Sequence, residues 1–157
     1  MTNSIARLGA VTLAAASLSS CGLSLKPDPI AFDQAQKAYV ELVSGQDDQL
    51  MSQLPKEVQN PTTRRTMAAM RAILPPGQAT PAKLVGWNDT VGTSGHVETV
   101  VMLYDYPGEH ILAQAQFTKT AAGALALANF NVRGATDTET RATVFLTGDK
   151  APPVVDR

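Results

Sequence analysis

Asp105 and His110 are the two residues of this sequence whose types and spacing best suit proton-transfer chemistry. They flank the turn Tyr106-Pro107-Gly108-Glu109, which predicts a hairpin of two consecutive strands. If Tyr106 pairs with Glu109, Asp105 lies opposite His110, and Arg133 falls in the same row on a third strand. An aspartate beside a histidine can orient the imidazole as a general base. The plainer interpretation, which we favour, is a solvated and charge-balanced rim, since a catalytic pair should face a cavity lined by aromatic residues.

The rest of the composition argues against several other kinds of chemistry. Because the chain has one Cys and two His, it can form neither an intramolecular disulfide nor a thiolate-rich zinc site. The sequence has no GxSxG or HExxH motif, and Gly92-Thr93-Ser94-Gly95 is a flexible turn rather than a phosphate-binding loop. The 13 basic residues are balanced by 14 acidic ones and form no run longer than Arg64-Arg65. We therefore expect no metal, no cofactor and no nucleic-acid partner.

The first 21 residues have the pattern of an export signal. Arg7 is the only charged residue from Met1 to Ser20, and the apolar run that follows it is too short to span a bilayer. The run ends at Leu18-Ser19-Ser20-Cys21, which resembles the lipobox of bacterial lipoproteins. The alternative is a buried free thiol near the end of an ordinary signal peptide.

The resemblance to the lipobox implies how the chain is processed and where it resides. In that family the Cys is lipidated and becomes the mature N-terminus, which here assigns residues 1–20 to a signal peptide and the lipid to Cys21. A residue other than Asp after the Cys favours the outer membrane, and Gly22 stands at that position. The resemblance therefore implies an exported protein that is lipid-anchored at the periplasmic side of the outer membrane.

The remaining chain is long enough for one domain. We expect a tether over residues 21–28, a single α+β domain over 29–147 and a flexible tail over 148–157, where two prolines follow one another with little to bury. Helical periodicity fills the first half of the domain. The start signals Asp28-Pro29 and Asn60-Pro61 predict two helices, ended by Gly45 and by Pro75, and Asp47 can cap a short helix between them.

The second half of the domain has the alternating pattern of strands. The predicted strands are Lys83–Asn88, His96–Tyr106, Ile111–Thr120, Ala124–Arg133 and a weaker Ala142–Thr147. Helices followed by a run of strands predict an α+β fold, with N-terminal helices packed on an antiparallel sheet of four to five strands.

This order of elements resembles the nuclear-transport-factor-2-like superfamily, which has a cystatin-like α+β fold. The segments Leu84-Val85-Gly86-Trp87-Asn88 and Asn129-Phe130-Asn131-Val132 are similar to bacterial members without assigned activity. The resemblance covers residues 30–133 and implies a curved sheet that wraps a long helix into a cone. Because the superfamily holds isomerases, dehydratases, cyclases and members that only bind or dimerise, it implies no single function.

Strand alternation divides the predicted sheet into a core face and a mixed face. If the second long hairpin pairs Thr120 with Gly123, the core face carries Ala126, Ala128 and Phe130 beside the central alanines of the preceding strand. A small apolar ligand in the cone interior would contact Tyr39, Met67, Met70, Tyr104 and Phe117. Glu98 should point to the same face, either into a pocket or paired with Lys119 or Lys83, and Trp87 should pack there or line a ligand site.

The mixed face interleaves Leu and Val with Gln and Asn and is almost free of Lys and Glu, which is the composition of a wet protein interface. Its predicted centre is Leu112, Gln114, Gln116, Leu127 and Asn129. The sequence thus favours a membrane-tethered, non-enzymatic lipoprotein that binds a protein partner or a second copy of itself through this face. The alternatives are a small apolar ligand in the cone and, third, a proton-transfer enzyme built on Asp105 and His110.

Overall fold

Three helices and one helical turn precede the sheet. The computed structural model describes residues 27–92, 95–120 and 123–140. Helix α1 spans Pro29–Val43, α2 spans Asp47–Gln53, a 3₁₀ turn covers Lys56–Val58, and α3 spans Pro61–Ala72. The Asp28 carboxylate accepts a hydrogen bond from the Ile30 N–H, and the Asn60 side chain accepts from the N–H groups of Thr62 and Thr63. Both predicted helix starts are therefore confirmed, each with a side-chain cap followed by proline.

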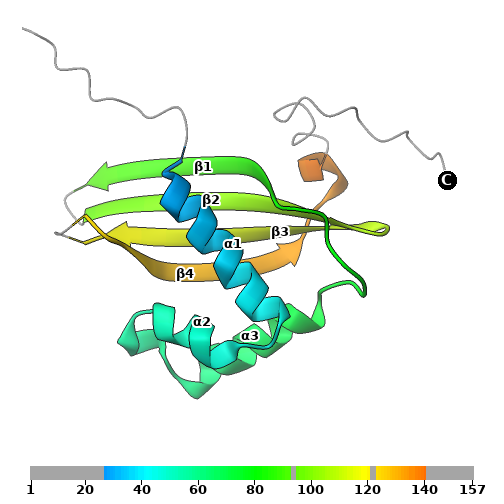
Figure 1. The fold of residues 1–157 in the computed structure, drawn as a ribbon, viewed down its shortest axis with the longest axis horizontal. Coiled ribbons are helices and arrows are strands. Elements are labelled where there is room, and N and C mark those ends of the chain that lie inside the picture. The colour runs from blue at the N-terminus through cyan, green and yellow to red at the C-terminus, as the bar shows by residue number, and fades with distance from the viewer. Residues whose placement is uncertain (1–26, 93–94, 121–122, 141–157) are drawn as a thin grey trace, which may run out of the picture.

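Four antiparallel strands in the order β1-β2-β3-β4 form one open sheet (Figure 1). Strand β1 spans Lys83–Gly92, β2 Gly95–Tyr106, β3 Glu109–Lys119 and β4 Leu125–Gly134. The predicted α+β class and the antiparallel order are confirmed. The fifth predicted strand, Ala142–Thr147, lies outside the described residues. In the described parts of the chain, no helix is long and apolar enough to cross a membrane.

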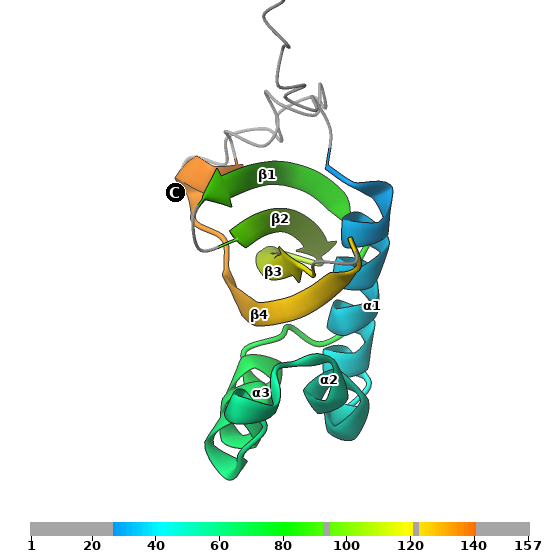
Figure 2. The same cartoon turned by 90° about the vertical axis from the view of Figure 1, so that its left-hand side faces the viewer.

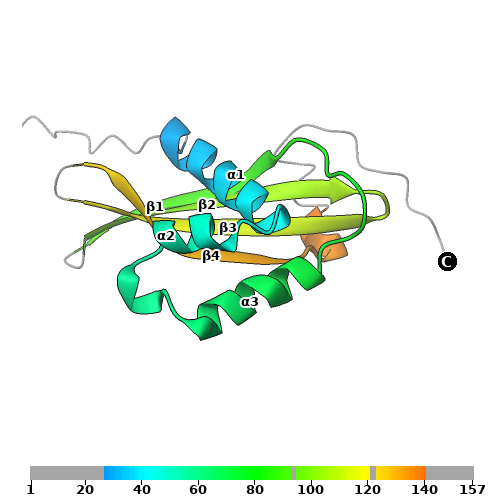
Figure 3. The same ribbon diagram turned by 60° about the horizontal axis from the view of Figure 1, so that its bottom comes forward.

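Helix α1 runs diagonally across one face of the sheet, which we call the core face (Figure 1). Helices α2 and α3 lie beside the β4 edge (Figure 3). A short helical turn at residues 137–140 lies on the opposite side of the sheet from α1, next to what we call the outer face (Figure 2). The strands are strongly curved in this end-on view.

Small residues on both surfaces let α1 approach the sheet closely. Ala31, Ala35 and Ala38 on α1 and Ala113 and Ala115 on β3 are all fully buried. The largest fully buried side chains are Phe117, Leu42, Leu50, Met67, Met102, Ile111 and Val100. Close packing of this kind leaves few voids between a helix and a sheet.

The β2–β3 hairpin has the predicted register, and the β3–β4 hairpin does not. Tyr106 pairs with Glu109 as expected, whereas Lys119 pairs with Leu125, one position beyond the predicted partner. A bulge between Gln116 and Phe117 then shifts the pairing by a further residue. The two shifts add up to two residues, so the β4 side chains beyond the bulge lie on the face that was predicted for them. Between the turn and the bulge, each β4 side chain lies on the face opposite to the predicted one.

Leu127 shows the consequence of this shift. It was predicted on the mixed face, but it pairs with Phe117 and is buried in the core, 3% exposed. Ala126, predicted in the core, is exposed instead. The turn is the physical reason, because the Thr120 N–H donates to the Ala124 carbonyl at 2.8 Å, so that Lys119 pairs with Leu125 and Phe117 with Leu127. The bulge, where Ala128 is the extra residue, then returns the rest of β4 to the predicted faces.

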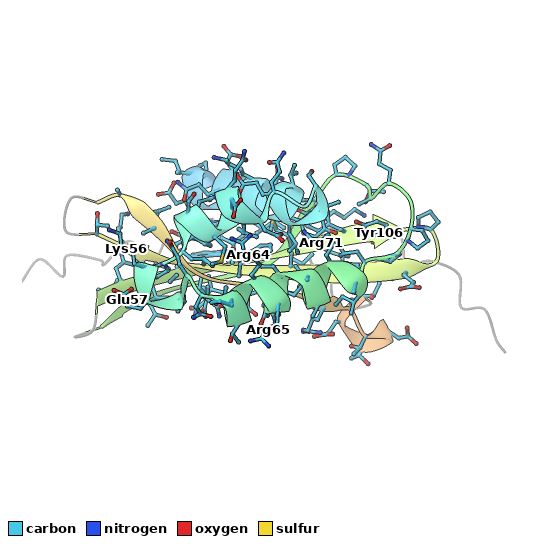
Figure 4. All side chains as sticks on the ribbon, turned by 90° about the horizontal axis from the view of Figure 1, so that it is seen from below. Lys56, Glu57, Arg64, Arg65, Arg71 and Tyr106 are labelled. Atoms are coloured by element: carbon cyan, nitrogen blue, oxygen red, sulfur yellow. The ribbon has the colours of Figure 1, made fainter. Side chains whose placement is uncertain are left out.

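Arg71 joins the three helices. Its guanidinium makes two hydrogen bonds to the Asp47 carboxylate, of 2.7 and 3.0 Å, and donates to the Leu42 carbonyl at the end of α1 at 3.1 Å. These bonds lower the pKa of the Asp47 carboxyl below its usual value. Asp47 thus pairs with α3, and the predicted cap of α2 is wrong, since Gln46 is the capping residue and makes no side-chain cap bond. Figure 4 shows Arg64 and Arg71 on the side of α3 that faces α2.

Candidate functional site

Asp105 and His110 form the predicted pair, and neither of them lines any of the four hollows described below. The His110 Nδ1 lies 2.7 Å from the Asp105 Oδ1, and the Lys83 ammonium lies 3.5 Å from the other carboxylate oxygen. Both side chains lie on the outer face, where that of His110 is 37% exposed and that of Asp105 is 25% exposed. The geometry is that of a charge-balanced rim.

Arg133 does not complete this row. It lies opposite Leu112, two positions along β3 from its predicted partner His110, because the β4 register is shifted by one residue at the turn and by one more at the bulge. Its guanidinium pairs with Glu139, and together with hydrogen bonds from Thr136 it lowers the pKa of the Glu139 carboxyl to about 2. The Arg133 charge is therefore neutralised by the chain that follows β4.

The residues predicted as an interface do not share one exposed surface. Gln114, Gln116 and Asn129 lie on the outer face, where the Asn129 side-chain amide donates to the side-chain oxygen Oε1 of Gln116 at 3.5 Å. Leu112 is on that face too, but it is only 6% exposed in the folded chain. Since Leu127 is in the core, the polar members of the predicted interface remain accessible and the aliphatic ones do not.

The five residues predicted to surround one ligand are also separated. Phe117 is fully buried among core side chains. Met67 and Met70 border a narrow cleft of about 220 Å³ between α3 and β4. Tyr39 and Tyr104 line a different groove. These five side chains therefore do not surround one shared cavity. The small side chains of α1 and β3 bring the helix and the sheet together instead.

The groove beside Tyr39 and Tyr104 is the one with the composition of a ligand site, and we call it the tyrosine groove. It has a volume of about 520 Å³, within the range typical of small-molecule sites. It lies between the C-terminal half of α1, the segment 77–82 and the end of β2 (Figure 1). Its lining residues are Gln36, Tyr39, Val40, Val43, Ser44, Gly77, Gln78, Ala79, Thr80, Pro81, Ala82, Tyr104 and Tyr106.

The buried side of the tyrosine groove consists of the three tyrosines of the chain. The rings of Tyr39 and Tyr104 are stacked with centroids 3.7 Å apart, and the Tyr39 and Tyr106 hydroxyls share a hydrogen bond of 2.9 Å. Burial raises the pKa of Tyr39 and of Tyr104 above the usual tyrosine value, and for Tyr39 the Tyr106 hydroxyl adds to the effect. The phenols of Tyr39 and Tyr104 are therefore neutral at physiological pH.

The walls of the tyrosine groove are apolar and uncharged. Val40 and Val43 are 57% and 42% exposed, although they are aliphatic residues on a helix packed in the core. None of the lining residues is Asp, Glu, Lys, Arg or His. The few polar groups are hydroxyls and amides, which can orient a ligand but attract no ion.

A second hollow, which we call the acidic pocket, lies where the chain enters α1. It has a volume of about 340 Å³ and is lined by Pro27, Asp28, Pro29, Trp87, Asp89, His96, Glu98 and Lys119. Glu98 points to the core face as predicted and is 4% exposed. Its partner, however, is the N–H of Asp28, 2.8 Å from the Glu98 Oε1, and neither Lys119 nor Lys83 pairs with it.

A further hollow, of about 610 Å³ between α2 and α3, is lined by polar groups that already have partners. Arg64 donates to Asp48 at 2.6 Å, Arg65 donates to the Pro61 carbonyl at 3.4 Å, and the first N–H groups of α3 donate to the Asn60 side chain. Within the described ranges, no three His, Cys, Asp or Glu side chains are arranged to hold a metal ion.

Sequence reasoning missed Tyr106 and the segment 77–82, which complete the tyrosine groove. The signal for Tyr106 was present, since Tyr104 and Tyr106 alternate on β2 and must share the core face. The position of the segment was not predictable, because it depends on tertiary contacts such as the hydrogen bond from the Thr80 N–H to the Asp105 carbonyl, 2.9 Å.

Comparison with known proteins gives no relative for this chain: no family model, no curated protein and no solved structure matches it.

Proposed function

We propose that this chain is an exported, lipid-anchored binding protein whose ligand is a neutral apolar or aromatic small molecule held in the tyrosine groove. The observation that carries the proposal is the lining of that groove. Three buried tyrosines form its base, exposed valines form its wall, and no lining residue is charged. A site of this kind removes apolar ligand surface from water and has no charge to compensate an ionic ligand.

The groove is a better candidate than the outer face of the sheet. A partner bound at the outer face would meet Gln114, Gln116 and Asn129 but not the leucines that were expected to anchor it. Interfaces obtain most of their binding energy from a few buried apolar or aromatic anchors. The groove offers such anchors, and its position between a helix and the sheet is compatible with the nuclear-transport-factor-2-like cone that the sequence resembles.

A neutral aromatic fluorophore, N-phenyl-1-naphthylamine, tests the groove directly. We expect saturable binding with a blue-shifted, enhanced emission, because the probe enters an apolar site. Val40→Lys should weaken this binding about tenfold, since it places an ammonium at the wall without disturbing a buried side chain.

Val91→Lys is the matched control, because Val91 is 77% exposed on β1, away from the groove. It should bind the probe as the unmodified chain does. Equal binding by all three proteins would place the probe elsewhere, and the groove would then not be the site.

The membrane anchor is proposed from the sequence pattern at Leu18-Ser19-Ser20-Cys21, which lies outside the described residues. Growth of an expressing bacterium with a clickable palmitate analogue should label the unmodified chain. A Cys21→Ser variant should carry no label and should lose its fractionation with the outer membrane, because the thiol that accepts the lipid is gone. Label that persists in the variant would exclude lipidation at Cys21.

A further inference from the structure

The acidic pocket places two carboxylates of neighbouring strands directly opposite each other. Asp89 on β1 pairs in register with Glu98 on β2, and both side chains lie on the core face with Trp87. Like charges directly opposite across antiparallel strands destabilise a sheet. A local arrangement that opposes folding is typical of a functional site.

Glu98 is the more unusual of the two carboxylates. It is 4% exposed, and only its Oε1 atom is hydrogen-bonded, to the N–H of Asp28. In the described part of the chain no cation forms an ion pair with it. Buried carboxylates are normally paired or neutralised by a ligand, because removing a charge from water is costly.

The other groups of the pocket show which ligand would satisfy it. His96 Nε2 is bonded to Asp89 Oδ1, and Lys119 lies opposite His96 on the next strand. The lining contains the three carboxylates of Asp28, Asp89 and Glu98 and one ammonium, that of Lys119. An aromatic side chain beside carboxylates is suited to an ammonium group, which interacts favourably with both.

We propose that the acidic pocket binds a small zwitterion, whose ammonium group lies between Asp89 and Glu98 beside Trp87 and whose anionic group pairs with Lys119. The volume of about 340 Å³ suits a ligand of a few heavy atoms rather than a large metabolite. The chain that enters α1 closes one side of the pocket, since Pro27, Asp28 and Pro29 belong to its lining. The inference is independent of the tyrosine groove, which shares no residue with this pocket.

Trp87 is the only tryptophan of the chain, so its fluorescence reports on this pocket alone. The full chain is placed in nanodiscs of phosphatidylglycerol and titrated with O-phosphoethanolamine. We expect a saturable change in Trp87 emission. The titration is repeated in nanodiscs that also contain phosphatidylethanolamine. If Trp87 emission there differs before any compound is added, and the free compound causes no further change, the lipid headgroup is the source of the zwitterion. A response to the free compound in both kinds of nanodisc would identify a soluble ligand.

Glu98→Gln separates binding from packing, because the amide oxygen can still accept from the Asp28 N–H. This variant should weaken the response about tenfold in whichever nanodisc shows it, while Asp105→Asn, a carboxylate of the outer face, should not change it. Lys119→Gln, an exposed position, should remove the preference for O-phosphoethanolamine over ethanolamine. The proposal is overturned if Trp87 responds in neither nanodisc, or if Glu98→Gln and Lys119→Gln both bind as the unmodified chain does.

Discussion

Leu127→Asp should lower the free energy of unfolding by about 3–5 kcal/mol, a large part of the stability of an ordinary domain. The physical reason is the β4 register. Leu127 pairs with Phe117 and is 3% exposed, so the substituted carboxylate would be buried among apolar side chains without a partner. Urea unfolding followed by circular dichroism measures the change as a lower midpoint.

Ala126→Asp is the control for the register, because its side chain is exposed in the structure but would be in the core if Thr120 paired with Gly123. We expect a change within about 0.5 kcal/mol, as for other surface substitutions. If Ala126→Asp were severe and Leu127→Asp mild, β4 would have the register in which Thr120 pairs with Gly123, and the outer face would regain its leucine.

Phe117→Ala should cost about 3–5 kcal/mol, because Phe117 is fully buried and its removal leaves a cavity between helix and sheet. Gln114→Ala, on the outer face of the same strand, should change stability by no more than about 0.5 kcal/mol. Differential scanning calorimetry of the two variants gives both values. A cost for Phe117→Ala of about 1 kcal/mol or less would mean that the space between α1 and the sheet already holds a void, and a ligand site there would have to be reconsidered.

The sequence predicted the features of this fold that depend on local chemistry. Asp28-Pro29 and Asn60-Pro61 define helix starts because a capping side chain and a proline act within one turn. The β2–β3 register was also predictable, since the two-residue turn at Pro107-Gly108 leaves a single pairing for Tyr106.

What the sequence did not predict depends on tertiary contacts. The pairing at the β3–β4 turn, where the Thr120 N–H donates to the Ala124 carbonyl, decides the face of Leu127, and the bulge beyond it decides the faces of the later β4 residues. The acidic pocket was missed because β1 was predicted to end at Asn88, whereas it continues to Gly92 and carries Asp89 to a position opposite Glu98. The last residues of β1 are exposed and lack apolar alternation, so no pattern marks them as a strand.

The candidate ligand residues were correctly predicted to lie in the core, but they do not line one common cavity as predicted. Helical and strand periodicity predict which side chains belong to the core, and Tyr39, Tyr104 and Phe117 do so. Periodicity does not predict where the packing leaves a hollow, which depends on the volumes of all neighbouring side chains. The tyrosine groove therefore became visible only with the position of the segment 77–82.

The central claim is that a neutral ligand binds in the tyrosine groove, and selective ring labelling of tyrosine and tryptophan tests it most directly. All three tyrosines of the chain line the groove, and the only tryptophan lines the other pocket, so the two labels report on separate sites. In NMR spectra recorded during a titration with N-phenyl-1-naphthylamine, the signals of Tyr39, Tyr104 and Tyr106 should shift together and saturably, while the Trp87 signal stays in place. Unshifted tyrosine signals at saturating probe would contradict the account.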